Sequence, residues 1–425
     1  MSDDNQCTMK IVQTQLPVEQ PANFCVAPFI STMQTAHGKV TTCAYGAYDW
    51  LLEDSTPKEK WNISGLNNLR SHFANGGAPC TKCKNEENAG KYSLRLRLLD
   101  EFPTSYNDDI LTGKWQNGPV HLCTKVSNIC NLACRSCAGW DTNKYAAEGK
   151  HYLKTYQTQV LDLATNKLRQ TNRYIPRVGP RHTDYSMFHE IDSNLRKIEF
   201  YGGETLLNLT HLEYLEELAS KGLSRDITLM YATNCTQKLN PRHLKVWEKF
   251  KRIEFSLSID HLGDKFHYLR WPGDWGQVSK NVDEILSLKE KFSNTEVFCM
   301  VSPCCTMYNA YYIDEVLDWG KEHVGAVYIN MVADPAHIAI NIAPEEVKLQ
   351  MLDKIRSPEV RGFLQIKPHN PLLWKQFIIW AKRQDLYRNE DFTKTFPEFY
   401  EIIKPYWDSV TDLSEKNFYD NKKLD

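Results

Sequence analysis

Six strand-and-helix units in succession, beginning near residue 119, constrain the fold of this chain more than any other feature. Each predicted strand is rich in β-branched or aromatic residues and is bounded by turn residues. The strand candidates are Val120–Ser127, Lys197–Tyr201, Ile227–Thr233, Ile253–Ile259, Val297–Ser302 and Ala326–Val332, and the helix candidates between them include His211–Lys221, His243–Lys249, Val278–Phe292 and Ile313–Glu322. This pattern predicts an α/β fold with a parallel sheet, which right-handed crossovers curl into a full or partial barrel.

The segments on either side of these units have a different character. Residues 1–22 read as a polar tail. Residues 23–118 are rich in Gly, Asn, Thr and Cys, and we expect little core there unless something staples the segment together. Residues 341–425 are predicted to be helical, with a Trp- and Tyr-rich apolar stripe, and we interpret them as a packing cap on the barrel.

One connection within the barrel region, residues 119–340, is unusually long. An insertion at about 141–196 separates the first two predicted strands. It contains a helix candidate, Lys144–Lys167, and then a stretch rich in Pro, Arg and His, Arg173–Tyr185. Insertions of this length are often lids or substrate loops, but a surface excursion without a function fits equally well.

The cysteine count limits where such a chain works. The 425 residues include 13 cysteines, an odd number, so complete intramolecular disulfide pairing is impossible. The acidic, polar start of the chain is not a secretory signal, and no uncharged apolar run approaches the roughly 20 residues that span a bilayer. We therefore expect a cytoplasmic protein without a membrane partner, whose clustered thiols bind metal or carry out chemistry. A formal net charge of −2 gives no clear sign of nucleic-acid binding.

The first cysteine cluster directly follows the first predicted strand. Cys130, Cys134 and Cys137 are spaced so that three thiolates can converge within one tight loop. Three ligands leave one corner of a cubane iron–sulfur cluster open, whereas a closed structural zinc site has four. A zinc site remains the alternative, with Cys123 or His121 as its fourth ligand.

This CxxxCxxC motif, together with Asn128 and Asn131-Leu132, resembles the radical S-adenosylmethionine (SAM) enzymes. The resemblance implies a partial (β/α)6 TIM-like barrel and a [4Fe–4S] cluster that binds SAM. One position departs from the usual pattern. Ser136 stands where these enzymes usually have an apolar or aromatic residue near the adenine, so the resemblance implies altered packing there.

Later motifs follow the same resemblance in the order of the strands. Gly202-Gly203-Glu204 resembles the GGE motif that holds the SAM amino group, and a carboxylate suits an ammonium. Thr233-Asn234 matches the end of the third strand. Arg270 resembles an arginine of the peptide-modifying branch, and its guanidinium could hold the SAM carboxylate bidentately. Period-two spacing places three polar residues of the fourth strand on one face, toward the SAM ribose or carboxylate: Ser256, Ser258 and Asp260.

The second cysteine cluster lies before the barrel. Cys25, Cys43, Cys80 and Cys83, with Gly38 five positions before Cys43, resemble the SPASM and twitch modules that hold auxiliary clusters. Four cysteines match the half-size twitch module, which implies one auxiliary [4Fe–4S] cluster. Most such modules follow the barrel, whereas this one precedes it, and a four-thiolate zinc knuckle remains the alternative.

Three more thiols lie at the functional ends of predicted strands. Cys235, Cys304 and Cys305 are candidates for donating a hydrogen atom to a substrate radical or for binding a further cluster, and ordinary packing remains the alternative for each. Cys123 and Cys299 alternate within strands and are expected to be core residues.

The resemblance implies an enzyme that cleaves SAM to a 5′-deoxyadenosyl radical, which abstracts hydrogen from a peptide or protein substrate. An auxiliary cluster would assist, and an electron donor such as flavodoxin or ferredoxin would be a partner. Two alternatives stay open. One is the same chemistry on a small metabolite such as a sugar or nucleotide, and the other is a non-catalytic protein that binds zinc or a cluster.

Overall fold

A parallel sheet organises the chain. The computed structural model describes residues 19–34, 40–43, 57–103, 105–139, 141–162, 167–170, 174–175, 182–366 and 369–414. The main sheet has seven strands in the order β2-β1-β3-β6-β7-β8-β9, and every neighbouring pair is parallel except β1 with β2. Its strands are β1 (Ser31–Gln34), β2 (Val40–Thr41), β3 (His121–Lys125), β6 (Lys197–Tyr201), β7 (Thr228–Thr233), β8 (Arg252–Leu257) and β9 (Glu296–Val301).

Five of the six predicted barrel strands are β3, β6, β7, β8 and β9. The sixth appears as a bridge from Val301 to Val327, followed by a small parallel sheet of β10 (Cys304–Cys305) and β11 (Asn330–Met331). Within the described residues no strand pairing joins β11 back to β2. The predicted parallel α/β sheet is therefore confirmed, and the sheet is not a closed barrel.

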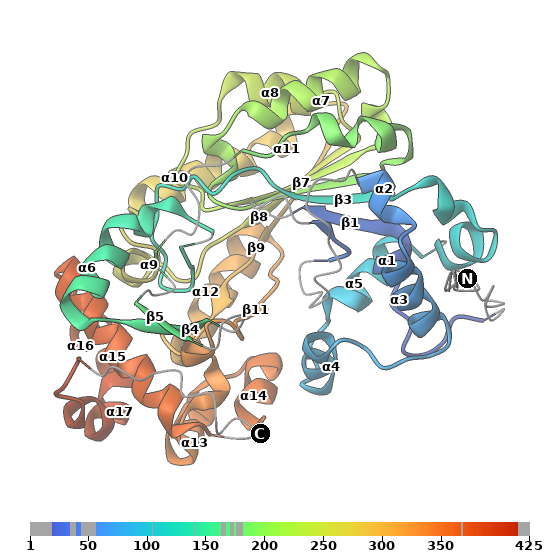
Figure 1. Cartoon of the computed structure of the whole chain (residues 1–425). Helices are drawn as coiled ribbons and strands as arrows, with labels where there is room; N and C mark the ends of the chain where they lie inside the picture. The colour runs from blue at the N-terminus through green and yellow to red at the C-terminus, as the bar shows by residue number, and fades with distance from the viewer. Residues whose placement is uncertain are drawn as a thin grey trace, which may run out of the picture.

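Helices cover the outer face of this sheet (Figure 1). They are α7 (Thr210–Ser220), α8 (Pro241–Trp247), α9 (Gly263–Leu269), α10 (Trp275–Leu286), α11 (Leu288–Lys291) and α12 (Ile313–Trp319). The period-two alternation of the strands explains the layers. Ile198 and Phe200 of β6 are fully buried among residues of the outer helices, whereas Glu199 and Tyr201 line a cavity inside the sheet.

The N-terminal region is more helical than predicted. It contains α1 (Ala27–Ile30), α2 (Pro57–Trp61), α3 (Ser64–Ala74), α4 (Thr81–Asn88) and α5 (Leu94–Glu101), grouped beside β1 in Figure 1. The expectation of little core is wrong, because Phe24, Phe29, Trp61 and Phe73 belong to a buried apolar cluster within this region. Strand β1 also joins the main sheet, beside the first barrel strand, so the region extends the sheet as well as preceding it.

The long insertion begins with a shorter helix than predicted. Helix α6 (Ala146–Tyr156) ends at Gln157, which has a left-handed backbone with φ of 49°. An antiparallel pair, β4 (Gln159–Asp162) and β5 (Lys167–Gln170), follows where the prediction continued the helix to Lys167. The prediction fails there because a left-handed residue terminates a helix, and β-branched residues such as Val160 suit an extended chain. Most of Arg173–Tyr185 lies outside the described residues.

The C-terminal region is helical, as predicted. Its helices are α13 (Glu345–Lys354), α14 (Pro358–Gln365), α15 (Pro371–Arg388), α16 (Phe392–Thr395) and α17 (Pro397–Ser409). They form a separate group in Figure 1 but share one hydrophobic core with the barrel, since the rings of Phe377 and Phe392 both contact Tyr308. No described helix combines the length and the apolar character that a membrane crossing requires.

Candidate functional site

The loop with the first cysteine cluster lies at the carboxyl end of β3. It has no regular secondary structure, and backbone hydrogen bonds to the segment after α9 hold it. The Ala133 N–H donates to the Trp271 carbonyl at 2.7 Å, and the Arg135 N–H donates to the Leu269 carbonyl at 2.8 Å. Within the loop, the Cys137 N–H donates to the Cys134 carbonyl at 2.9 Å. These contacts keep the three cysteines on one turn of chain.

The three thiols are electrostatically coupled, with Cys134 buried and Cys130 and Cys137 half-buried. Burial, followed by the charges of Cys134 and Glu204, raises the pKa of the Cys130 thiol to about 12. Burial also raises the pKa of Cys137 well above its usual range, and Asp141, Cys134 and Cys130 add to the effect. Thiols in such surroundings stay protonated and inert unless a cation stabilises their thiolates, which is what bound iron or zinc does.

A glycine turn from the next strand packs directly against this loop. Gly203 has φ of 53°, and a Cβ there would lie 2.2 Å from the Ile129 carbonyl oxygen, so only glycine fits. The Glu204 N–H donates to that same carbonyl at 2.8 Å, and the Gly203 N–H donates to the Asp141 carbonyl at 3.2 Å. Gly202 also has a positive φ, and a Cβ there would lie 2.8 Å from the Cβ of Lys125. The turn thus brings Glu204 under the cysteine loop.

The Glu204 carboxylate is fully buried and nearly saturated with donors. It accepts hydrogen bonds from the Thr233 hydroxyl at 2.7 Å, from the Asn234 N–H at 2.7 Å and from the Leu206 N–H at 3.1 Å. An ionised carboxylate has about four acceptor sites, so one remains for a ligand. Burial raises the pKa of Glu204, although these hydrogen bonds oppose the shift. A cationic group at the remaining site would stabilise the ionised form.

Asn234 links the end of β7 to the cysteine loop. Its side-chain Nδ2 donates to the side-chain Oδ1 of Asn131 at 3.1 Å and lies 3.8 Å from the Cys130 sulfur. The side-chain Oδ1 of Asn234 accepts from the N–H of Thr236 at 3.0 Å and from the Thr236 hydroxyl at 2.6 Å. Two predicted site residues, Asn234 and Cys130, are therefore neighbours although 104 residues separate them.

Arg270 and Asp260 form a buried ion pair beside the second cysteine. The Arg270 Nη2 donates to Asp260 Oδ1 at 2.9 Å, and Nη1 lies 3.7 Å from the Cys134 sulfur. Asp260 Oδ1 also accepts from the Cys304 N–H at 2.8 Å. Arg270 is therefore engaged before any ligand binds, which leaves its buried Nε without a hydrogen-bond acceptor in this structure. Bidentate binding of a SAM carboxylate stays a prediction.

The interior of the sheet holds a cavity of about 300 Å³, lined by hydroxyl and charged side chains as well as by apolar residues. Ser256 and Ser258 line it as predicted, and the Ser256 hydroxyl donates to the Ser302 hydroxyl at 2.8 Å. Cys43 of the N-terminal region and Cys304 also line it. Ser136, by contrast, is half-buried in the cysteine loop and does not line this cavity.

The structure separates the three candidate catalytic thiols. Cys235 and Cys305 are fully buried among apolar residues of the barrel core, which favours packing for both. Cys304 lines the interior cavity instead. Burial, followed by the charge of Asp260, raises the pKa of Cys304 to about 12, while Arg270 opposes the shift. Adjacent strand residues face opposite sides, which separates Cys304 from Cys305.

The residues around the cysteine loop suit an anionic metal–thiolate group. In the part of the chain that is described, no three cysteine sulfurs lie within 4.8 Å of one another, so the thiols are not gathered as closely as ligands that share one zinc ion. Two buried guanidinium nitrogens, Arg270 Nε and Arg388 Nη1, lack acceptors, and both arginines influence the pKa of Cys134. The proposed fourth zinc ligand His121 bonds instead to Ser31 and lies 3.5 Å from Glu199.

The four cysteines of the second cluster influence one another electrostatically. Burial raises the pKa of Cys25 well above its usual range, and the charges of Cys43, Cys83 and Cys80 add to this rise, so the four thiols are electrostatic neighbours. The Ala27 N–H donates to Cys25 and opposes the shift. Gly38 of the twitch-like pattern and Cys7 lie outside the described residues.

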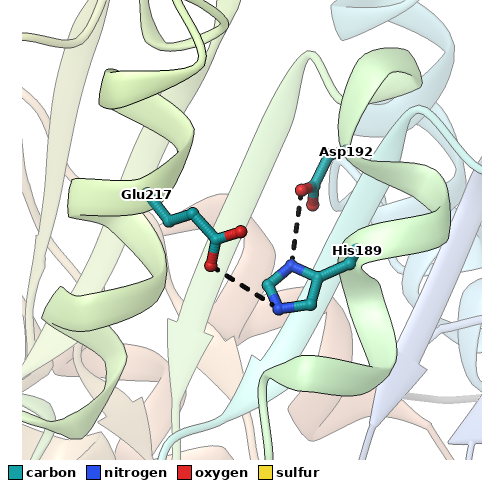
Figure 2. Close-up of side chains that lie close together, drawn as sticks. All are labelled: His189, Asp192 and Glu217. Carbon is teal, nitrogen blue, oxygen red and sulfur yellow. Dashed lines mark ion pairs between the residues drawn. The ribbon is translucent and has the colours of Figure 1, made fainter.

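One compact group of ligand-type side chains lies elsewhere (Figure 2). His189, Asp192 and Glu217 come from η4 (Ser186–Asn194) and α7, beside the amino end of β6. Lys221 already pairs with both carboxylates, at 2.9 Å from Asp192 and 2.7 Å from Glu217. This is a partly exposed ion-pair network, and it carries no metal proposal.

Sequence reasoning missed the charged lining of the interior cavity. Arg97 of α5 lies 3.2 Å from Glu199, and Tyr201 donates to the same carboxylate at 2.9 Å. Burial alone would raise the pKa of Glu199. Nearby positive charges, with Arg97 as the largest, hold it well below its usual range instead. The sequence contained a signal for this lining. Glu199 alternates with the apolar Ile198 and Phe200 in a strand, so its side chain faces the opposite side of the sheet from theirs.

Comparisons with known proteins found distant likenesses. No family model and no curated protein matches the sequence. The structure of anSMEcpe with bound AdoMet is similar to this chain at 17% identity and a TM-score of 0.35. The match covers 64% of this chain and 63% of the anSMEcpe chain, which is less than two thirds of the length of anSMEcpe. The structure of Streptococcus suis SuiB bound to precursor peptide SuiA matches 74% of this chain and 67% of its own, at 12% identity and a TM-score of 0.31. These values assign neither a family nor an activity.

Proposed function

We propose that the chain is a radical SAM enzyme with a [4Fe–4S] cluster on Cys130, Cys134 and Cys137. The observation that carries this proposal is the convergence of polar groups from three successive strand ends on the three-cysteine loop that follows β3. Glu204, Asn234 and Asp260, which end or follow β6, β7 and β8, reach the loop directly or through Arg270. The carboxyl ends of parallel strands are where ligands bind in such folds.

The side chains have distinct tasks in this proposal. The three thiolates hold three irons, and the fourth iron is left for SAM. Glu204 uses its remaining acceptor site for the SAM ammonium, and Arg270 directs its unpartnered Nε toward the carboxylate. Asp260 keeps the guanidinium in place. When bound, the cluster supplies the electron that cleaves SAM and so generates the 5′-deoxyadenosyl radical.

The N-terminal region is proposed to hold an auxiliary [4Fe–4S] cluster on Cys25, Cys43, Cys80 and Cys83. Support comes from the electrostatic proximity of the four thiols and from the position of Cys43 in the wall of the interior cavity. Cys304 lines the same cavity and is electrostatically coupled to Cys134. A substrate in this cavity would lie between the two cysteine clusters, where an electron can pass to the auxiliary cluster from the substrate.

The substrate is proposed to be a peptide or protein. A second cavity of about 440 Å³ begins beside Cys80 and is walled by apolar residues of β11, of the segment before α13 and of α14. An apolar side chain of a peptide could lie there. A small metabolite such as a sugar or nucleotide remains the second candidate, because the Ser256, Ser258 and Ser302 hydroxyls of the interior cavity could bind its polar groups. Flavodoxin or ferredoxin would supply the electron.

The test is anaerobic incubation of iron-reconstituted protein with SAM and dithionite, with 5′-deoxyadenosine measured by mass spectrometry. Wild-type protein should form it, and Cys130→Ala, Cys134→Ala or Cys137→Ala should each abolish it, because two ligands do not retain a cluster with an open corner. A variant that still forms 5′-deoxyadenosine would refute the assignment. Adding a native cell extract and comparing peptide and metabolite masses then separates the two substrate classes.

A further inference from the structure

The cysteine loop is held from behind by the C-terminal helix α15. We propose that α15 is a positioning element for the cluster, which acts through Arg388 and through the Asp385–Arg135–Glu390 bridge. This inference rests on the proposed function, because the cluster is the group that would be positioned. It assigns the C-terminal helices a role in the site beyond packing.

Arg388 is the direct link between helix α15 and the cysteine loop. It is wholly buried, and its Nη2 donates to the Ala133 carbonyl, inside the loop, at 2.9 Å. Its Nε and Nη2 also bind both oxygens of Glu148 on α6, at 3.2 and 3.0 Å. Tyr145, which precedes α6, donates to the carbonyl of Cys134. One arginine therefore connects the cap, the insertion and the loop.

Arg135 forms a second link, from within the loop itself. Its side chain is completely buried and lies 2.7 Å from Asp385 and 2.8 Å from Glu390, at the end of α15. Its guanidinium also stacks over the Tyr268 ring at 3.6 Å. The two arginines bind the loop to the same end of one helix, through loop residues on either side of Cys134, Ala133 and Arg135.

Burying these charges is expensive, and stability alone does not account for it. Buried ion pairs often contribute little net stability compared with apolar residues of similar volume, and fixing one conformation is a use found in some proteins. The loop has no helix or strand to hold its shape, so side-chain contacts must do so. Partners that orient metal ligands in this way typically change metal affinity or activity about 10- to 100-fold when mutated.

The Arg388 charge also lies beside the cysteine loop. Its Nη2 binds the carbonyl of Ala133, the residue before Cys134, and its buried Nη1 has no hydrogen-bond acceptor. A positive charge near a cluster favours its reduced form, because reduction adds negative charge. Arg388 is thus expected to set both the shape of the loop and the reduction potential of the group that it holds.

The experiment compares Arg388→Gln, Arg388→Lys and a matched control, Arg383→Gln. Arg383 lies on the same helix and is equally buried, but it donates to the Leu413 carbonyl and stacks on the rings of Tyr156 and Trp380. Hydrogen exchange of residues 130–137 is measured on protein without iron. Iron loss to a chelator and the reduction potential, followed by electron paramagnetic resonance, are measured after reconstitution.

Arg388→Gln should exchange faster in the loop, lose iron about 10- to 100-fold faster and have a lower potential. Arg388→Lys should restore the potential because it keeps the charge, and Arg383→Gln should resemble wild type in all three measurements. If Arg388→Gln does not fold, Tyr145→Phe tests the same loop contact and should also speed iron loss. Equal iron loss and equal loop exchange in Arg388→Gln and Arg383→Gln would overturn the inference. Wild-type protein that takes up no iron would instead refute the proposed function. The hydrogen-exchange data would still test whether Arg388 holds the cysteine loop.

Discussion

At the residue scale, hydrogen bonds and ion pairs within the protein already fix the side chains of this site. Glu204 reaches the cysteine loop only because Gly203 lets the backbone approach Ile129, and three protein donors then orient its carboxylate. Arg270 is held by Asp260 in the same manner. Both side chains are pre-organised in the absence of a ligand, so each can bind SAM without losing further side-chain entropy.

The residue-scale prediction concerns the charge of Glu204. Glu204→Gln keeps the shape but removes the negative charge, so the ammonium of SAM would bind a neutral acceptor instead of a carboxylate. Hydrogen bonds to charged groups contribute about 1.5–3 kcal/mol, so we expect a loss of roughly 1.4 kcal/mol, which is about a tenfold weaker SAM affinity by equilibrium dialysis. Iron content should stay at the wild-type level. Loss of iron together with SAM would indicate that Glu204 supports the loop instead.

At the scale of elements, a layer of aromatic rings joins the outer helices to the sheet. The rings of His211 of α7 and His243 of α8 are tilted against each other with centroids 5.6 Å apart, and His211 Nε2 lies 3.0 Å from the Tyr231 hydroxyl of β7. The Trp247 ring is likewise tilted against His243, with centroids 5.0 Å apart. Burial, aided by the charge of Arg242, lowers the pKa of His243 to about 4, and burial also lowers the pKa of His211 well below its usual range.

This layer predicts that the fold weakens in acid. The folded-state pKa values lie below the unfolded value of about 6.5, so the unfolded chain binds more protons between about pH 6.5 and 4. Stability is therefore full above pH 6.5 and falls as the pH drops through this window, by up to about 1.4 kcal/mol per pH unit for each histidine. Urea unfolding of iron-free protein from pH 7.5 to 4.5 measures the slope. His243→Phe should reduce it, and an unchanged slope would contradict the assignment.

At the scale of the whole molecule, the N-terminal region and the barrel region both contribute residues to the lining of the interior cavity. β1 extends the sheet next to β3, and α5 places Arg97 against Glu199 inside it. Cys43 then lines the same cavity as Ser258 and Cys304. A cluster on the four N-terminal cysteines would thus be a structural neighbour of the substrate cavity, and its assembly would be coupled to folding of the region.

The molecular-scale prediction is a metal count. Wild-type protein reconstituted anaerobically should contain about eight irons and no zinc, and the variant with Cys25, Cys43, Cys80 and Cys83 all changed to Ala should contain about four. That variant should still cleave SAM but be cut more readily by protease before residue 119, because it lacks a staple. About four irons with one zinc in the wild type would identify a zinc knuckle and reject the auxiliary cluster.

Much of the architecture could be predicted from local patterns. Strand alternation, the order of the βα units and the motifs at strand ends depend on residues close together in the sequence, so five strands and the helical C-terminus came out where expected. Local propensity failed at Gln157, where a left-handed residue ended α6 early, and in the N-terminal region, where the apolar residues that form the core are scattered over many short elements.

The sequence by itself determined which thiols to propose as cluster ligands, because Cys130, Cys134 and Cys137 are close enough in the chain to converge within one loop. Only the tertiary structure decided what surrounds them. It placed Arg388 on the Ala133 carbonyl across 255 residues, engaged Arg270 with Asp260, and turned Cys304 toward the cavity while Cys305 joined the core. The physical reason is that such contacts depend on how strands pair and helices pack. Residue periodicity indicates which face of an element a side chain lies on, but it does not identify a contact partner that is distant in the sequence.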